Sequence, residues 1–336
     1  MTRRFPPDPT PSMAPPRGVR QVMGWVLLAL LPAALIHHLW FGWGIWLQIG
    51  LAAGFALLIE ATALRLRGLP VQPFLTDLSA PLTGVLFAFC LPPDAPWWIA
   101  AFGMLFAIGI AKHAYGGLGG NTFNPAMVGY AAALVCFPAE MARWPVPGTL
   151  DLGATVQQVF GLSAPLDAIA RPTPLDQARN ALGEGLSISE LRAGEAFRGG
   201  AAHPALPLAL AFAAGGALLL WQRLIHWRQP AALLLGLLAL AAPAWLLDPD
   251  LHLSPMEHLV QGAAVMAAFF IITDPVSGCS TPRGQWLFGI GVALLTLLIR
   301  EFGQYPDGIV FAVLLMNAAA PWIELHSRPR IHGESK

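Results

Sequence analysis

The chain has 336 residues, of which 56% are hydrophobic and only 11% are charged. A soluble domain carries about 25% charged residues, so this composition excludes an ordinary soluble protein and predicts a polytopic membrane protein. The net charge of zero gives no reason to expect nucleic-acid binding. The three cysteines, Cys90, Cys136 and Cys279, are far apart and form no Cys-x-x-Cys pair, which argues against a metal or iron–sulfur site built by this chain alone.

The apolar runs fall into two groups around one polar segment. Residues 1–21 are rich in proline and arginine and lack the features of a cleavable signal, so they predict a disordered cytoplasmic tail. The first group, within 22–138, comprises runs at about 22–41, 44–64, 80–92, 96–113 and 122–138. The polar segment 139–202 precedes the second group, within 203–326, with runs at about 203–222, 230–248, 256–273, 284–300 and 307–325. A cytoplasmic tail, 327–336, ends the chain. Since a membrane-spanning helix needs about 20 apolar residues, we expect an all-α membrane protein with about ten transmembrane helices.

The two groups of runs resemble each other weakly. In each group the third run is awkward: 80–92 ends at Pro92, and 256–273 ends just before Pro275, where proline removes a backbone donor and breaks a helix. The next run in each contains Phe-Gly. Because each group holds an odd number of spans, a duplicated unit must lie in two opposite orientations. We therefore predict two inverted five-helix repeats, an arrangement whose interrupted helices usually mark a midplane site.

Lysine and arginine fix the expected orientation. Five of the 19 basic residues lie in the segment 139–202, and the short outer loops hold only Arg300 when the N-terminus is placed inside. The remaining basic residues then lie on the inner side, as the positive-inside rule requires. We therefore expect a multi-pass protein of the bacterial inner membrane with both termini cytoplasmic and 139–202 in the periplasm.

A glycine-rich turn, Gly116 to Ala126, precedes the last run of the first group. No strand precedes it, so it is not a dinucleotide fingerprint. One interpretation is structural: glycines permit close helix packing, and Asn124 before Pro125 is a helix N-cap. The other is functional: free N–H groups at a helix N-terminus bind an anion or a polar ring. The candidate binding residues are Gly119, Gly120, Asn121, Thr122 and Asn124.

Two carboxylates lie in or beside apolar runs and are candidates for an ion path. A carboxylate in the membrane is costly and usually has a partner or a role. Asp274 either pairs with Arg283, helps to bind a cation, or belongs to a solvated turn at the end of a helix. Glu60 lies deep in the second run and is the better candidate. Glu257, in contrast, has a structural explanation, because Ser254 and Glu257 form a capping-box pattern.

The polar segment contains the sequence Ala170-Arg171-Pro172-Thr173-Pro174-Leu175-Asp176. Thr173 followed by proline and, at the third helical position, an acid is typical of a helix start. The hydroxyl of such a threonine also faces free backbone N–H groups and the positive end of the helix dipole, where an esterified phosphate would be well placed. The residues alone leave both interpretations open.

Three stretches carry a resemblance: Gly119 to Ala126, Thr273 to Val276, and Thr173 to Asp176. They resemble the membrane-subunit family that contains the D subunit of Rnf electron-transport complexes and, more distantly, the B subunit of the sodium-translocating NADH:quinone reductase. The resemblance implies that Thr173 carries FMN through a phosphoester formed by a flavin transferase. Asp167 matches the acid of the family motif at the right separation, whereas Ala170, Arg171 and Pro172 depart from its Ser/Thr, Gly and Ala.

The resemblance also implies a function. A second flavin, riboflavin, would bind without a covalent bond in the membrane, and the turn at 116–126 would form part of its site. The complex would move electrons between NADH and ferredoxin and couple this to sodium or proton translocation, with the other membrane and peripheral subunits as partners. Flavins carry out such redox chemistry themselves, so no catalytic acid or base is expected. The competing class is a channel or secondary transporter, in which a polar segment presenting an esterifiable threonine has no purpose.

Overall fold

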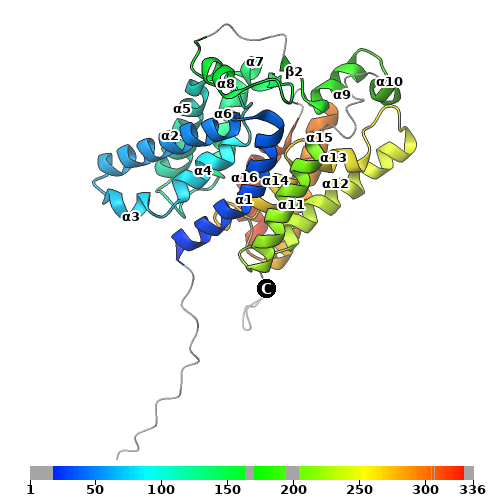
Figure 1. Cartoon of the computed structure of the whole chain (residues 1–336). Helices are drawn as coiled ribbons and strands as arrows, with labels where there is room; N and C mark the ends of the chain where they lie inside the picture. The colour runs from blue at the N-terminus through cyan, green and yellow to red at the C-terminus, as the bar shows by residue number, and fades with distance from the viewer. Residues whose placement is uncertain (1–17, 163–169, 194–203, 304, 306, 329–336) are drawn as a thin grey trace, which may run out of the picture.

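The computed structural model describes residues 18–162, 170–193, 204–303, 305 and 307–328. Its elements are almost all helices (Figure 1). Within these described ranges the strands are two residues long, β1 (Trp144–Pro145) and β2 (Ala170–Arg171), and they pair antiparallel. The predicted tails fall mainly outside the described residues, although the first helix already begins at Val19.

The first group of apolar runs forms seven consecutive helical elements. They are α1 (Val19–Phe41), α2 (Gly44–Leu66), α3 (Val71–Leu75), α4 (Ser79–Ala88), α5 (Trp97–Met104), the π-helix η1 (Leu105–Ala114) and α6 (Pro125–Cys136). The π-helix directly continues α5. As expected from the prolines at 92 and 93, the awkward third run gives only the short α4 and a turn.

The polar segment and the second group follow. The polar segment contains α7 (Pro138–Ala142), β1, α8 (Leu152–Val159), β2, α9 (Pro174–Gly183) and α10 (Ile188–Ala193). The second group contains α11 (Ala205–Trp221), α12 (Arg228–Leu247), α13 (Pro255–Val260), α14 (Ala264–Met266), the π-helix η4 (Ala267–Ile271), α15 (Pro282–Phe302) and α16 (Ile309–Ser327). Its awkward third run is again broken, here into α13, α14 and η4.

Six helices are long and apolar enough to cross a membrane. They are α1, α2, α5 joined to η1, α12, α15 and α16, and the shorter apolar helices are α6 and α11. The prediction of an all-α polytopic membrane protein is therefore confirmed in its class. The count of ten spans and the inverted repeats stay predictions, because the remaining helices among the described residues are too short to be assigned as spans by length alone.

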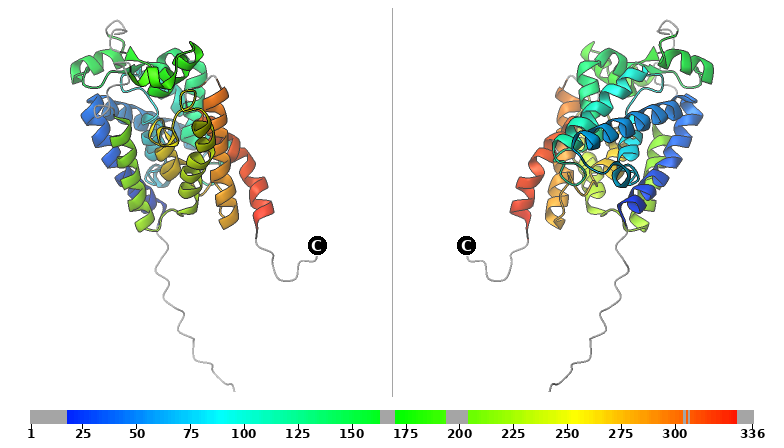
Figure 2. Two further views of the ribbon diagram at one scale, coloured as in Figure 1. Left: turned by 90° about the vertical axis from the view of Figure 1, so that its right-hand side faces the viewer. Right: turned by 90° about the vertical axis from the view of Figure 1, so that its left-hand side faces the viewer.

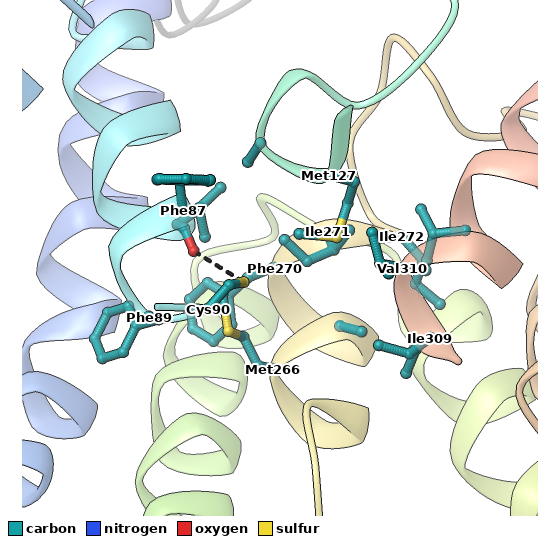
Figure 3. Packing of buried hydrophobic residues seen from close by; sticks show 14 of the residues in the cluster. Phe87, Phe89, Cys90, Met127, Met266, Phe270, Ile271, Ile272, Ile309 and Val310 are labelled. Atoms are coloured by element: carbon teal, nitrogen blue, oxygen red, sulfur yellow. Dashed lines mark hydrogen bonds between the residues drawn. The ribbon is translucent and has the colours of Figure 1, made fainter. Parts of the chain in front are cut away.

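Residues from both groups share one apolar core. Helix α1 packs on α11, α2 packs on α4, and α12 packs on α15. Figure 3 shows Phe87 and Cys90 of the α4 region close to Met266 and Phe270 of the second group. Gly84 lets α4 approach α2 closely, because a Cβ atom there would lie 2.7 Å from the backbone nitrogen of Ala53.

The two ends of the described chain lie on the same side of the molecule. The start of α1 and the end of α16 point downward in all three views, whereas α7 to α10 cover the upper side (Figures 1 and 2). That the tails share one compartment and the polar segment occupies the other stays a prediction. Which compartment is which stays a prediction from the basic residues.

Candidate functional site

Thr173 caps helix α9, as its sequence predicts. The Thr173 hydroxyl donates a hydrogen bond to Asp176 Oδ2 at 2.6 Å, and the Asp176 backbone N–H donates to Thr173 Oγ1 at 3.3 Å. The other oxygen of Asp176 accepts from Arg179 Nη2 at 3.1 Å. Thr173 is half-buried and Asp176 is buried. The structure thus joins the proposed acceptor hydroxyl to a carboxylate, whereas Asp167 lies outside the described residues.

The polar segment is anchored on the second half of the protein. Arg192 forms a two-point ion pair with Glu257, with Nη2 at 2.7 Å from Oε2 and Nε at 3.2 Å from Oε1. The N–H of Ile188 donates to the carbonyl of Asp250 at 2.8 Å. The predicted capping box of Glu257 with Ser254 is confirmed. These contacts hold α10 against α13 and the loop that precedes it.

A cavity of about 320 Å³ lies between α9 and the helices of the second half. Its lining combines apolar and charged side chains: Leu175, Ala178, Arg179, Leu182, Gly183, Leu251, Leu253, His258, Arg300 and Glu301. Arg300 is held by the His258 carbonyl at 2.7 Å and by Asp307 Oδ1 at 3.0 Å. Arg300 Nε and His258 Nδ1 are nevertheless buried with no hydrogen-bond partner among the described residues. From the sequence, Arg300 stood out only as a basic residue of the outer loops, and His258 carried no signal.

The glycine-rich turn behaves as a helix cap. Asn124 caps α6 by accepting from the Met127 N–H at 3.3 Å, and Asn121 Nδ2 donates to the Phe123 carbonyl at 3.1 Å. Gly119 has a left-handed φ of 87°, which favours glycine. The predicted N-cap at Asn124 is therefore confirmed, whereas close helix packing is not seen at Gly116 or Gly119, where a Cβ atom would have nothing within 4 Å. Binding of a flavin by Gly119, Gly120, Asn121, Thr122 and Asn124 stays a prediction.

Asn317 of α16 joins two of the predicted constellations. Its Oδ1 accepts from the backbone N–H of Asn124 at 3.1 Å, and its Nδ2 donates to the Ser277 carbonyl at 2.9 Å. The Asn317 side chain is buried. The turn at 116–126 and the turn at 273–283 therefore meet through one amide, which no local sequence pattern indicates.

Asp274 belongs to a local turn. Its Oδ1 accepts from the Val276 N–H at 3.1 Å and its Oδ2 accepts from the Ser277 hydroxyl at 2.8 Å. Both Asp274 and Arg283 are described, and they do not form an ion pair, so the suggested pairing of these two residues is wrong. The carboxylate bonds to its own turn instead, and its part in an ion path stays a prediction.

Glu60 lies in a buried ionic network, of which the sequence indicated Glu60 but not its partner. Its Oε1 accepts from Lys112 Nζ at 2.6 Å, and the two side chains are only 1% and 3% exposed. Lys112 also donates to Ser79 Oγ at 2.7 Å, and Ser79 Oγ donates to Asp77 Oδ1 at 2.6 Å. From the sequence, Lys112 was expected only as one of the basic residues of the inner side. A lysine within the apolar run 96–113 was the signal that could have identified it.

A second chain of contacts leads from Glu60 to the glycine-rich turn. His113 Nε2 lies 3.6 Å from Glu60 Oε1, and Arg67 Nη1 donates to His113 Nδ1 at 3.2 Å. Arg67 Nη2 donates to the Gly116 carbonyl at 3.1 Å. Glu60 is therefore connected to the turn at 116–126 through Arg67, whereas Asp274 reaches the same turn from another direction, through Ser277 and Asn317.

The whole chain has known relatives. It matches the NQR2, RnfD, RnfE family over residues 8–333. The chain belongs to this family. It is 43% identical over 337 residues to a Salmonella paratyphi A protein named as the D subunit of an ion-translocating oxidoreductase complex, covering 95% of this chain and 96% of the relative. The protein of the same name from Escherichia coli O127:H6 is 42% identical over 340 residues with the same coverage. Membership of the NQR2, RnfD, RnfE family confirms the resemblance that the three stretches carried.

Proposed function

We propose that the chain is the membrane subunit of an Rnf-type complex that transfers electrons between NADH and ferredoxin and couples this transfer to sodium or proton translocation. The name of the relatives, which joins ion translocation to oxidoreduction, supports this class. Its partners are the other membrane and peripheral subunits, and its location is the bacterial inner membrane with both termini cytoplasmic. A channel or secondary transporter has less support, since relatives of nearly the same length are named as oxidoreductase subunits.

We propose further that Thr173 carries FMN, attached by a flavin transferase through a phosphoester. The observation that carries this proposal is the Thr173 hydroxyl at the N-terminus of α9, bonded to Asp176 Oδ2 at 2.6 Å. Asp176 is placed to accept the proton of the Thr173 hydroxyl. The positive end of the α9 helix dipole favours an anion there by about 0.3–1 kcal/mol. When bound, the flavin supplies the electron-carrying chemistry.

The cavity beside α9 has a mixed lining. Leu175, Leu182 and Leu253 offer apolar surface, and Arg300 and His258 are among its charged and polar side chains. This combination is suited to a group with an apolar body and a polar edge. For the second flavin, riboflavin, we retain the turn at 116–126, because its contacts through Arg67 link it to the buried network of Glu60.

The covalent flavin is tested by producing the chain with its transferase and examining the denatured band under ultraviolet light. We expect fluorescence from the wild-type chain, none from Thr173→Ala, and some from Thr173→Ser, because a primary hydroxyl can form the same ester. Thr149→Ala removes another hydroxyl of the polar segment, which bonds to the Val146 carbonyl, and should leave the band fluorescent. A dark wild-type band with an active transferase would refute the assignment.

A further inference from the structure

The buried network of Glu60 runs from a half-buried residue to the interior of the first helical group. Asp77 is half-buried, while Ser79, Lys112 and Glu60 are buried. The order Asp77, Ser79, Lys112, Glu60 is continuous, with donor–acceptor distances of 2.6, 2.7 and 2.6 Å. It lies where α2 and η1 end and α4 begins, which is the side expected to face the cytoplasm. Ionisable groups placed inside a membrane protein mark ion or proton paths more often than they serve stability.

The network has one unused acceptor at its inner end. Glu60 Oε2 is buried and has no hydrogen-bond partner among the described residues, and the same holds for His113 Nε2. A buried carboxylate with one unpaired oxygen is costly. Lys112 therefore neutralises Glu60 but leaves its second oxygen without a partner, and such an oxygen can accept another positive group.

Lys112 is placed where it can exchange partners. Its four-carbon stem carries three rotatable N–H donors, and it already contacts both Glu60 and Ser79. It lies on the π-helix η1, a geometry that appears frequently at functional sites. Release of Glu60 would leave the ammonium hydrogen-bonded to Ser79, whose hydroxyl is bonded in turn to Asp77.

We propose that Lys112 is the internal counter-cation of an ion path whose binding carboxylate is Glu60. A transported monovalent cation, a proton or a sodium ion, binds the Glu60 carboxylate, and the Lys112–Glu60 ion pair breaks. The Lys112 ammonium remains hydrogen-bonded to Ser79, whose hydroxyl is bonded in turn to Asp77. When the cation leaves, the ion pair forms again, so one cation enters for each displacement of the ammonium. This inference rests on the proposed ion translocation.

The experiment measures cations moved per electron by the whole complex in sealed vesicles, using radioactive sodium in one arm and an enclosed pH dye in the other. Lys112→Met should lower this ratio by about tenfold or more, because an ion path depends on its intramembrane charges. The decisive variant is Glu60→Gln combined with Lys112→Met. If the Lys112–Glu60 ion pair serves only stability, replacing both residues with uncharged ones costs little. A purely structural role therefore predicts the wild-type ratio of cations to electrons in the double variant. Our inference predicts the same lowered ratio as in Lys112→Met.

The control is Arg65→Met, which removes an exposed charge from the same helix α2 and should leave the ratio at the wild-type value. Co-purification of the other subunits shows that each variant is assembled. A wild-type ratio in the double variant would overturn the inference. A wild-type complex that moves neither cation would instead refute the proposed translocation, so the two failures are distinguishable.

Discussion

Asn317 shows how one side chain can join segments that lie far apart in the sequence. It is 193 residues from Asn124 and 40 residues from Ser277, yet it bonds to the backbone of both. Both backbone groups lie in the interior, where an unsatisfied donor or acceptor costs about 1–3 kcal/mol. Asn317 therefore fixes the relative positions of the turns at 116–126 and 273–283.

We expect Asn317→Ala to lower the thermal stability of the purified protein markedly, because it leaves both backbone groups without their partner, at about 1–3 kcal/mol each. The measurement is the temperature at which the detergent-solubilised protein loses its monodisperse elution peak. Asn180→Ala serves as the control, since Asn180 is exposed on α9. Equal midpoints for the two variants would show that the bridge contributes nothing.

At the scale of single residues, the positions where helices begin were predictable from the sequence. Hydrogen-bond partners that lie far apart in the sequence were not. Thr173, Asn124 and Ser254 each precede a proline at the first helical position, and each caps its helix as the local pattern predicts. Glu60 was identified from its position in an apolar run, but its partner Lys112 is 52 residues away. No local rule specifies such a pairing, because it depends on how η1 packs against α2.

Among the elements, the packing of α4 against α2 depends on Gly84. A Cβ atom at this position would lie 2.7–2.9 Å from backbone atoms of Ala52 and Ala53, closer than real side-chain contacts. Backbone atoms cannot rotate away, so α4 would have to shift. Helix α4 carries Ser79, a member of the Glu60 network, at its first residue. A shift of this short helix would therefore disturb the network as well as the core.

We expect Gly84→Ala to destabilise the protein by about 1–3 kcal/mol, the usual cost of overpacking a core. Gly54→Ala is a matched control, because Gly54 lies on α2 and a Cβ atom there would have nothing within 4 Å. Alanine also has a higher helix propensity than glycine, which favours helix α2 in this control. Thermal unfolding of both variants in the same detergent provides the measurement. Unfolding of Gly84→Ala at the same temperature as Gly54→Ala would contradict the close approach.

The breaks in the helices were also predictable, but their detailed form was not. The helices of the two awkward runs end four residues before Pro92 and Pro275, at Ala88 and Ile271. Proline alone does not decide this, because Pro32, Pro243 and Pro321 lie inside α1, α12 and α16. The sequence did not predict that α5 continues as the π-helix η1 or that the second awkward run divides into α13, α14 and η4. These forms depend on the neighbouring helices, which a local pattern does not contain.

For the whole molecule, composition was sufficient to predict the class, whereas the number of spans depends on how the short helices are covered. Six helices are long and apolar enough to cross a membrane, whereas α4 and α13 fall short of the required length. Short or broken helices can reach the membrane interior only where protein covers their free backbone groups. The shared core around Phe87 and Phe270 provides such cover for the ends of both broken runs (Figure 3).

The orientation of the molecule leads to the last prediction. Both ends of the described chain lie on one side and α7 to α10 lie on the other (Figure 2). Basic residues favour the cytoplasmic side, and most of them lie outside the segment 139–202. Reporter domains fused after residue 150 and after residue 336 should therefore give opposite signals, periplasmic for the first and cytoplasmic for the second. A reporter after residue 67, which follows Arg65 and Arg67 at the end of α2, should match the C-terminal one. The fusions at 150 and 336 would report the same compartment only if the second group crossed the membrane an even number of times. That result would refute the ten-span arrangement and the periplasmic position of Thr173.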